Sequence, residues 1–471
     1  MSRRDALQFV ADYFDGGGFK TDLARRVAIP TESQNPDRAG ELQRYLGQEM
    51  IPVLQSLGFS CRTITQPAAP GPFLYAERIE AGHLPTVLGY GHGDVIHGLA
   101  AEWRRPAEPW RLLEADGRYW GRGVADNKGQ HSINLAAMAA VLHARGSLGF
   151  NAKWLLEMGE EVGSRGLREV CHDNKALLAA DVFIASDGPR LSADRPTIFL
   201  GSRGSVSIDF WIDARESGHH SGNWGGLLSS PAIQLVHALS TIVDAKGRIL
   251  VPELRPVRIS NSVRQVLADC PIEPGPDDPA TDPEWSEPGL TPAEKVFAWN
   301  AFEILAMTSG SPESPVNAIP PRAWARTQVR FVVGVDPNQF VPAIRKHLDR
   351  HGFQMVTVAP AGDEIMHATR LDPDHPWVHW TAASIERTIG RRPAILPNLG
   401  GSLPNDIFSD LLGLPTIWVP HSYPGCSQHA PNEHLPCNLA REALQLMAGL
   451  YWDLGEPGTP ERQRQNAVGR A

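Results

Sequence analysis

Cysteine is scarce in this chain, and the cysteines that it has show no pairing pattern. The 471 residues include five, which are Cys61, Cys171, Cys270, Cys426 and Cys437. Their odd number, their wide spacing and the lack of a Cys-X-X-Cys pair favour neither a disulfide framework nor a thiolate zinc site. Any bound metal is therefore expected on histidine and carboxylate side chains.

Long apolar runs are missing as well. The first residues, MSRRDALQFVADYFDGGGFK, become polar before any stretch of signal-peptide length. No later run reaches the ~20 apolar residues that a membrane-spanning helix needs. We therefore expect a cytoplasmic protein without a membrane partner.

Positive charge is in deficit. The chain has 44 Lys and Arg residues against 53 Asp and Glu residues, which gives a formal net charge of −9. This balance argues against nucleic acid or an anionic membrane as the main partner. Small molecules and other proteins remain as partners.

The length of the chain predicts more than one domain, because a single hydrophobic core stops growing well below this size. Residues 1–202 and 369–471 alternate helix-like and strand-like segments. This pattern predicts an α/β catalytic domain with a mainly parallel mixed sheet covered by helices. Residues 203–368 have the pattern of an inserted α+β domain. We expect a surface loop at 271–290, rich in Pro and acidic residues, and a disordered tail from about residue 455.

Polar side chains follow four predicted strands, at residues 86–90, 150–158, 181–185 and 414–420. In an open α/β sheet, ligands bind at the edge where the parallel strands end. Together with one residue of the loop sequence GRGVADNKG, these strand ends supply one candidate set: His92, Asp94, Asp126, Glu160, Glu161, Asp187 and His429. We expect this set to converge at one edge of the sheet.

The candidate set contains imidazoles and carboxylates, which suit Zn²⁺, with Mn²⁺ or Co²⁺ as possible substitutes. Two divalent ions fit its charge better than one, because Asp126, Glu161, Asp187 and one hydroxide balance them. A water that bridges two such ions becomes a nucleophile near neutral pH. The adjacent carboxylates of Glu160 and Glu161 can supply one metal ligand and one general base for that water.

Taken together and in order, several short motifs resemble those of a known family. They are GHGDV, GRGVADNKG, GEEVGSRG, SDGP, RGSVSIDF, HSGNWGG, NAIP and HAPNE. The resemblance is to the M20 family of di-zinc peptidases and amidases, which includes carnosinase-like dipeptidases, glutamate carboxypeptidase, acetylornithine deacetylase and succinyl-diaminopimelate desuccinylase. It runs from about residue 20 to residue 450, and the long segment between HSGNWGG and NAIP is more similar to the dipeptidase branch.

The resemblance implies a role for each metal ligand. It places His92 and Asp187 on one zinc ion, Glu161 and His429 on the other, and Asp126 on both. A carboxylate that bridges two cations is consistent with the charge balance above.

The resemblance also assigns the residues beside the ligands. Glu160 resembles the general base, and Asp94 resembles the carboxylate that orients the imidazole of His92. In the family the peptide bond after the bridging Asp is cis, which here is the bond between Asp126 and Asn127.

For the inserted domain, the resemblance implies a lid that also forms a homodimer. His220 would polarise the scissile carbonyl, reaching across the dimer interface into the partner's site. The substrate's carboxylate end would be held by Asn317, Arg330, Gly401 and Ser402. A turn-capping role for His220 and an ion pair with an acid across the strand for Arg330 remain as alternatives.

Three places depart from the family's pattern. The sequence GDVIHGL puts His97 near a position where Pro is usual, and Asn398 precedes Leu399 where Arg or Glu is common. Asn405 and Asp406 stand where apolar residues are common. These departures bear on substrate choice more than on metal binding, and the roles of these side chains stay open.

The sequence therefore predicts an enzyme that hydrolyses an amide bond in a small carboxylate-bearing molecule such as a dipeptide. An N-acyl or N-carbamoyl amino acid remains an alternative substrate, because the same activated water attacks either carbonyl. A catalytically silent dimer that binds or scaffolds is the alternative of another class, and the intact base and ligand set count against it.

Overall fold

The computed structural model describes residues 2–104, 108–272, 280–362 and 365–460. The chain divides into two compact units. The first comprises Met1–Gly201, Leu371–Leu396 and Pro404–Ala471, and the second comprises Ser202–Arg370 and Pro397–Leu403. Much of the tail predicted to be disordered, and residues 273–279 of the predicted loop at 271–290, lie outside the described residues.

An eight-stranded mixed sheet organises the first unit, in the order β1-β2-β6-β3-β7-β16-β8-β15. Its strands are β1 (Ser60–Ile64), β2 (Phe73–Arg78), β3 (Thr86–His92), β6 (Asn151–Glu157), β7 (Val182–Ala185), β8 (Thr197–Phe199), β15 (Ala394–Leu396) and β16 (Thr416–Trp418). The central strands β6, β3, β7 and β16 run parallel to one another. The predicted fold class is confirmed, and each of the four predicted strands is found.

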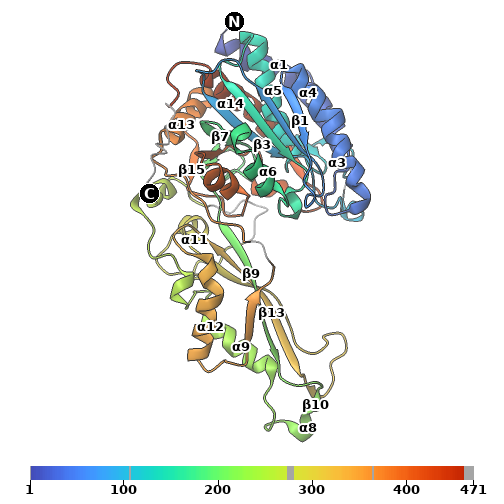
Figure 1. Cartoon of the computed structure of the whole chain (residues 1–471), viewed down its shortest axis with the longest axis vertical. Helices are drawn as coiled ribbons and strands as arrows, with labels where there is room; N and C mark the ends of the chain where they lie inside the picture. Colours follow the sequence, from blue (N-terminus) through green and yellow to red (C-terminus); the bar gives the residue numbers. More distant parts are fainter. Residues whose placement is uncertain (1, 105–107, 273–279, 363–364, 461–471) are drawn as a thin grey trace. The chain divides into compact units, whose positions relative to one another are not determined.

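Burial explains why these segments form the centre of the sheet. Every residue of β7 is buried, as are all but the first residue of β3 and all but one of β6. Continuous burial is typical of parallel strands with both faces covered. Helices α1 (Arg3–Asp15), α5 (Lys128–Arg145) and α14 (Cys437–Leu454) pack against one another (Figure 1).

The remaining elements of the first unit are short or peripheral. The helices are α2 (Gly18–Val27), α3 (Ala39–Tyr45), α4 (Ile51–Ser56), α6 (Leu167–Asp173), α7 (Lys175–Leu178) and α13 (Pro376–Ile389). A small sheet joins β4 (Leu113–Ala115), β5 (Arg118–Trp120) and β17 (His434–Pro436). Helix α13 begins at a proline and ends before Gly390, whose φ of 71° suits a helix C-terminus.

The second unit contains a four-stranded antiparallel sheet in the order β11-β13-β9-β14. Its strands are β9 (Gly204–Asp213), β11 (Ala301–Thr308), β13 (Arg322–Phe331) and β14 (Thr357–Pro360). Its helices are α8 (Ser221–Trp224), α9 (Pro231–Ile242), α10 (Asn261–Ala268), α11 (Pro292–Phe297) and α12 (Phe340–Arg350), and a two-stranded ribbon joins β10 (His219–His220) to β12 (Ala318–Ile319).

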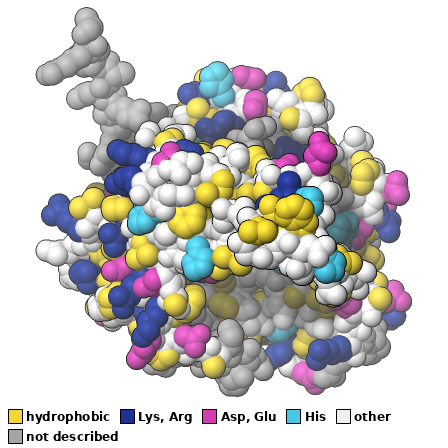
Figure 2. All heavy atoms as spheres, turned by 90° about the horizontal axis from the view of Figure 1, so that it is seen from below, with side chains coloured by type: hydrophobic (Ala, Val, Ile, Leu, Met, Phe, Trp, Pro, Cys, Tyr) yellow, Lys and Arg dark blue, Asp and Glu magenta, His cyan; other side chains and the backbone are white. Residues whose placement is uncertain are grey.

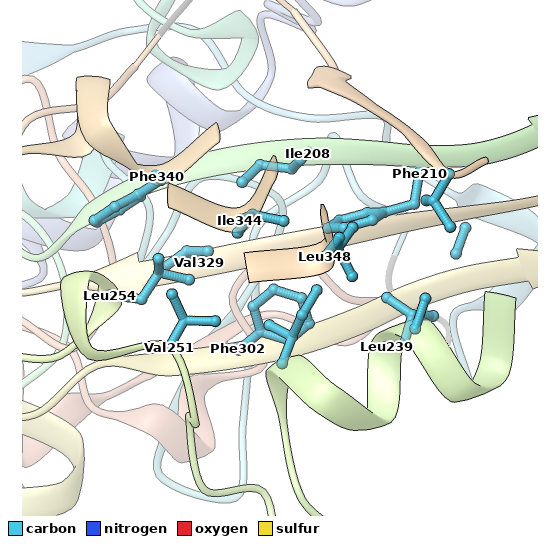
Figure 3. Packing of buried hydrophobic residues seen from close by; sticks show 14 of the residues in the cluster. Ile208, Phe210, Leu239, Val251, Leu254, Phe302, Val329, Phe340, Ile344 and Leu348 are labelled. Atoms are coloured by element: carbon cyan, nitrogen blue, oxygen red, sulfur yellow. The ribbon is translucent and has the colours of Figure 1, made fainter. Parts of the chain in front are cut away.

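One face of this sheet is covered by helices. Burial alternates along β9 and along β13, as expected of a sheet with one apolar face. Figure 3 shows Ile208 of β9 and Val329 of β13 packed with Ile344 and Leu348 of α12, while Leu239 reaches the same cluster from α9. The predicted α+β pattern of this segment is therefore present.

The segment 397–403 differs from the predicted domain limits. The sequence placed it in the catalytic domain, whereas it packs with the second unit. Its backbone explains the difference, because Ser202 forms a bridge to Leu399 and the amide of Arg203 donates to the carbonyls of Leu399 and Gly401 at 3.1 Å. Contacts between segments far apart in the chain leave no pattern in a single sequence.

Candidate metal centre

The strand order of the first unit gathers the candidate residues at one edge. Strands β6, β3 and β7 are neighbours and parallel, so their carboxyl ends meet. His92 is the last residue of β3, Asp187 follows β7 closely, and Glu160 and Glu161 lie in a 3-10 turn after β6. The convergence expected from the sequence is therefore present, at the edge where ligands bind in α/β sheets.

Two groups of side chains at this edge have their ligand atoms close enough to hold a metal ion. The first is His92, Asp126 and Asp187, and the second is Asp126, Glu161 and His429, with the ligand atoms of each group within 4.8 Å of one another. Asp126 belongs to both groups. This is the arrangement that the sequence predicts for two ions sharing one carboxylate.

In the first group, Nε2 of His92 lies 3.1 Å from Oδ1 of Asp126 and 3.6 Å from Oδ2 of Asp187. Oδ1 of Asp187 accepts the amide of Gly188, whereas Oδ2 is buried and has no hydrogen-bond partner among the described residues. A buried carboxylate oxygen without a donor is suited to a cation.

In the second group, Nε2 of His429 lies 2.9 Å from Oε2 of Glu161 and 3.1 Å from Oδ2 of Asp126. His429 has a φ of 58°, in the left-handed region, and its side chain is exposed. The peptide bond between Asp126 and Asn127 is cis, as the resemblance implies.

The carboxyl groups at this edge lie close together and partly out of water, with few positive charges beside them among the described residues. Burial, together with the charge of Asp126, raises the pKa of Glu161 to about 7 and that of Asp187 to about 6. Hydrogen bonds to Asp126 and Glu161 raise the pKa of His429 to about 11. Buried acids that repel one another are stabilised by cations, so the donor set fits divalent metal ions.

Glu160 lies beside the two groups but belongs to neither. Burial raises its pKa well above the ordinary value, and the neighbouring charges of Glu161 and Asp187 raise it further, although His92 opposes them. A carboxyl group with a raised pKa is suited to accepting and releasing a proton near neutral pH.

Asp94 has a wider role than the one implied by the resemblance. Nδ1 of His92 lies 3.0 Å from its backbone oxygen and 3.4 Å from its carboxylate Oδ1. The two carboxylate oxygens also accept the backbone amides of Glu160 and Glu161, at 3.2 and 3.1 Å. Asp94 therefore contacts both the imidazole and the turn that carries the two glutamates.

Glu433 is a residue of this edge that the sequence analysis did not single out. Its two carboxylate oxygens accept the backbone amides of Gly123, Ala125 and Asp126 at 2.9 to 3.0 Å. It also pairs with the guanidinium of Arg122 at 2.9 Å, and both side chains are 1% exposed. Its place in the HAPNE motif is the one feature of the sequence that could have indicated this role. The loop whose backbone amides it accepts lies more than 300 positions earlier in the chain.

The second unit holds its candidate residues at two separate places. Nη1 of Arg330 donates to Oγ of Ser402 at 2.9 Å, near one end of β13. At the other end, Asn317 accepts the amide of Ser221 beside His220, where β10 pairs with β12. Arg322 and Arg330 are eight positions apart on β13, which corresponds to about 26 Å in an extended strand.

The structure also bears on the alternative roles of His220 and Arg330, which are turn capping and an ion pair across the strand. Nδ1 of the exposed His220 accepts the amide of Gly222 at 3.1 Å, so the capping contact is present and uses one ring nitrogen. Among the described residues Arg330 forms no ion pair; its partner is the hydroxyl of Ser402.

Asn405 and Asp406, which form one of the three departures from the family pattern, have structural roles. The side-chain nitrogen of Asn405 donates to Oγ1 of Thr416, and its Oδ1 accepts a hydrogen bond from Nε1 of Trp418. The carboxylate of Asp406 forms an ion pair with Arg168. His97 is exposed, and its Nδ1 lies 3.9 Å from a carboxylate oxygen of Glu32.

No helix in the described ranges is long and apolar enough to cross a membrane. On the face shown in Figure 2, Lys and Arg side chains lie among acidic and hydrophobic ones and do not form one continuous basic field.

Comparison with known proteins is consistent with the fold and the edge residues. The family model described as Peptidase family M20/M25/M40 matches residues 88–453. The Beta-Ala-His dipeptidase of Mus musculus is 33% identical over 469 residues, which cover 92% of this chain and 88% of that protein. The Cys-Gly metallodipeptidase of Saccharomyces cerevisiae is 25% identical over 457 residues, covering 91% of this chain and 94% of that protein.

Solved structures agree in fold. The crystal structure of an M20 family metallo-carboxypeptidase from Sulfolobus solfataricus has a TM-score of 0.76 at 24% identity, covering 93% of this chain and 99% of that chain. Human carnosine dipeptidase 1 has a TM-score of 0.73 at 23% identity, covering 95% and 98%. The family model matches most of the chain, and the chain carries the motifs in order with the edge residues close together. The chain therefore belongs to the peptidase family M20/M25/M40.

Proposed function

We propose that this chain is a metal-dependent dipeptidase that cleaves the amide bond of a small substrate with a free carboxylate. The observation that carries the proposal is the pair of ligand groups that share Asp126, with Glu160 beside them. The relatives named as dipeptidases, which match over most of both chains, support the substrate class.

His92, Asp126 and Asp187 would hold one metal ion, and Asp126, Glu161 and His429 a second. We propose Zn²⁺ for both, with Mn²⁺ or Co²⁺ as substitutes, because the donors are imidazoles and carboxylates. When bound, such ions lower the pKa of a water and polarise a carbonyl.

Glu160 would take the proton from the attacking water and return it to the departing nitrogen. Its position next to Glu161 places it beside the ligands without making it one of them. Asp94 would hold the turn of both glutamates, since it accepts the backbone amides of both. A positioned general base typically contributes 10²–10⁴-fold to the rate.

His220 would donate a hydrogen bond to the scissile carbonyl oxygen of a substrate bound to a partner chain. The separation within the second unit supports this, because His220 and Asn317 lie about 26 Å of strand away from Arg330 and Ser402. One chain therefore cannot bring both pairs to one dipeptide through this sheet. In a homodimer, each chain would supply His220 and Asn317 to the substrate bound by the other chain, so that one dipeptide contacts both pairs of residues.

The exposed apolar residues of the second unit support the homodimer. Strand β11 is an edge strand, and its Ile304, Leu305 and Met307 are 41 to 54% exposed. On α9, Ile233 and Val236 are 61% and 51% exposed. An edge strand with apolar side chains is a template for pairing with a second chain.

Arg330, Ser402 and Gly401 would hold the carboxylate end of the substrate, with Asn317 supplied by the partner. The hydrogen bond between Arg330 and Ser402 supports this, since it joins two of these residues. The guanidinium fork suits a carboxylate.

The decisive experiment is turnover of a mixed panel of dipeptides, N-acyl amino acids and N-carbamoyl amino acids by metal-loaded protein, read by mass spectrometry. We expect cleavage of dipeptides, and a loss of about 10²–10⁴-fold in Glu160→Gln with metal content unchanged. Cleavage confined to N-acyl or N-carbamoyl compounds would move the substrate class. Retained turnover in the variant would exclude Glu160 as the base, and no turnover at all with two metals bound would favour the silent dimer.

A cytoplasmic location stays a prediction from the sequence.

A further inference from the structure

Three arginines of the second unit converge on one short segment of the same unit, residues 397–403. The contacts are Arg203 Nε to the Gly400 carbonyl at 2.7 Å, Arg370 Nη2 to Oδ1 of Asn398 at 2.9 Å, and Arg330 Nη1 to Oγ of Ser402 at 2.9 Å. The three contacted residues alternate along five positions of the chain. The guanidinium groups therefore follow one stretch of backbone.

Hydrogen bonds between Ser202 and Thr369 hold the segments of Arg203 and Arg370 together as antiparallel neighbours. The amide of Ser202 donates to Oγ1 of Thr369 at 3.1 Å, and the amide of Thr369 donates to the carbonyl of Ser202 at 3.0 Å. The amide of Leu371 donates to the carbonyl of Leu200 and Ser205 bridges Met366 in antiparallel fashion, so Arg203 and Arg370 lie diagonally on either side of the pair of Ser202 and Thr369. In the sheet, Arg330 pairs with Ser205, two positions from Arg203.

Within the part of the chain that the structure describes, the three guanidinium groups have little negative charge around them. Among the described residues, none of them forms an ion pair with a carboxylate. Burial lowers the pKa of Arg203 and that of Arg370 to about 10; next in effect on Arg203 is the charge of Arg330, while Glu303 opposes both. Nε of Arg370 is buried and has no hydrogen-bond partner in the described part of the chain. Partly buried cations of this kind are stabilised by an anion.

We propose that Arg203, Arg330 and Arg370 form an anion subsite that binds a substrate with two carboxylates, so that the preferred dipeptides end in Glu or Asp. This rests on the proposed function, which already assigns one substrate carboxylate to Arg330. Among the described residues, Glu303 is the acid whose charge acts on Arg203, and the balance of three guanidinium groups against this one acid leaves two positive charges. The chain-terminal carboxylate neutralises one of them and an acidic side chain neutralises the other, each through the forked donors of an arginine.

The test compares Ala-Glu with Ala-Gln, two dipeptides of nearly the same shape that differ by one charge. We expect the metal-loaded enzyme to show a kcat/KM for Ala-Glu that is about tenfold or more above that for Ala-Gln. Arg370→Gln should lower the value for Ala-Glu by about 10- to 100-fold and change that for Ala-Gln by about twofold or less. Arg370→Lys should recover part of the loss, because it restores the charge without the fork. The matched control is Arg258→Gln, which alters an exposed arginine of the same unit and should change neither value.

Equal or faster cleavage of Ala-Gln by the wild type would overturn the subsite and leave the proposed function standing. If the wild type cleaves no dipeptide faster than Glu160→Gln does, the proposed function fails, and the subsite is judged by binding alone. Calorimetry should then show glutarate binding about tenfold more tightly than butyrate, with the difference lost in Arg370→Gln. Equal binding of the two acids overturns the subsite, and this comparison on the wild type decides the matter even if the variant does not fold.

Discussion

Glu433 shows how much one buried side chain can control at this edge. It accepts three backbone amides of the loop that carries Asp126, and it neutralises Arg122. Replacing it by Gln puts an amide group against these donors and leaves Arg122 buried without its partner. We expect Glu433→Gln to lower the free energy of unfolding by about 3 kcal/mol or more, and to weaken metal binding by about 10- to 100-fold.

Denaturant unfolding and metal titration by calorimetry measure these two effects separately. Glu216→Gln, which alters an exposed carboxylate, is the control and should change neither. If Glu433→Gln loses stability but the folded variant binds metal as tightly as the wild type does, Glu433 supports the fold without positioning Asp126.

At the scale of elements, His421 ties the segment after β16 to helix α5. Its amide donates to Oε1 of Gln130 at 2.8 Å, and its Nε2 lies 3.0 Å from Oγ of Ser186. Its Nδ1 is buried with no hydrogen-bond partner among the residues described. Burial, and next the charge of Arg190, lower its pKa well below the ordinary imidazole value.

This depressed pKa predicts a loss of stability in acid. Below about pH 6.5 the unfolded chain binds a proton at His421 that the folded chain does not, so the free energy of unfolding should fall with decreasing pH. The slope from one such group is about 1.4 kcal/mol per pH unit. Unfolding of His421→Gln between pH 5 and 7 should be less steep than that of the wild type by about this amount. His83→Gln, at an exposed position, should keep the wild-type slope; an unchanged slope in His421→Gln would contradict the prediction.

At the scale of the whole molecule, the proposed contribution of His220 to the partner's site predicts that two inactive variants regain activity when they are mixed. Glu160→Gln and His220→Asn should each be inactive alone. Mixed and allowed to exchange subunits, half of the dimers contain one chain of each kind, and one site in each of these dimers has both an intact Glu160 and an intact partner His220. We expect about a quarter of the wild-type activity in the mixture.

Subunit exchange must be shown separately, by mass spectrometry of differently labelled chains. Exchange without recovered activity would mean that His220 acts within its own chain or not at all. A second variant, Val236→Asp on the exposed face of α9, should shift the protein to a monomer in light scattering and abolish activity if that face forms the interface.

The sequence by itself determined the family, the hydrolysis of a peptide bond, the fold class and the strands that carry the edge residues. It could do so because these features are local, since each motif is contiguous and His92, Glu160, Glu161 and Asp187 lie at a strand end or within a few positions of one. The sequence predicted His92, Asp126, Asp187, Glu161 and His429 as metal ligands. The structure places their ligand atoms in two groups that share Asp126, and their role in metal binding stays a prediction.

Only the tertiary structure decided the features that depend on pairs far apart in the chain. The transfer of residues 397–403 to the second unit, the hold of Glu433 on the loop of Asp126, and the convergence of three arginines on that segment are all of this kind. The backbone and side-chain bonds that produce them join positions about 30 to 300 residues apart. Such bonds form after the sheets have brought distant segments together, and no spacing or period along a single sequence records them.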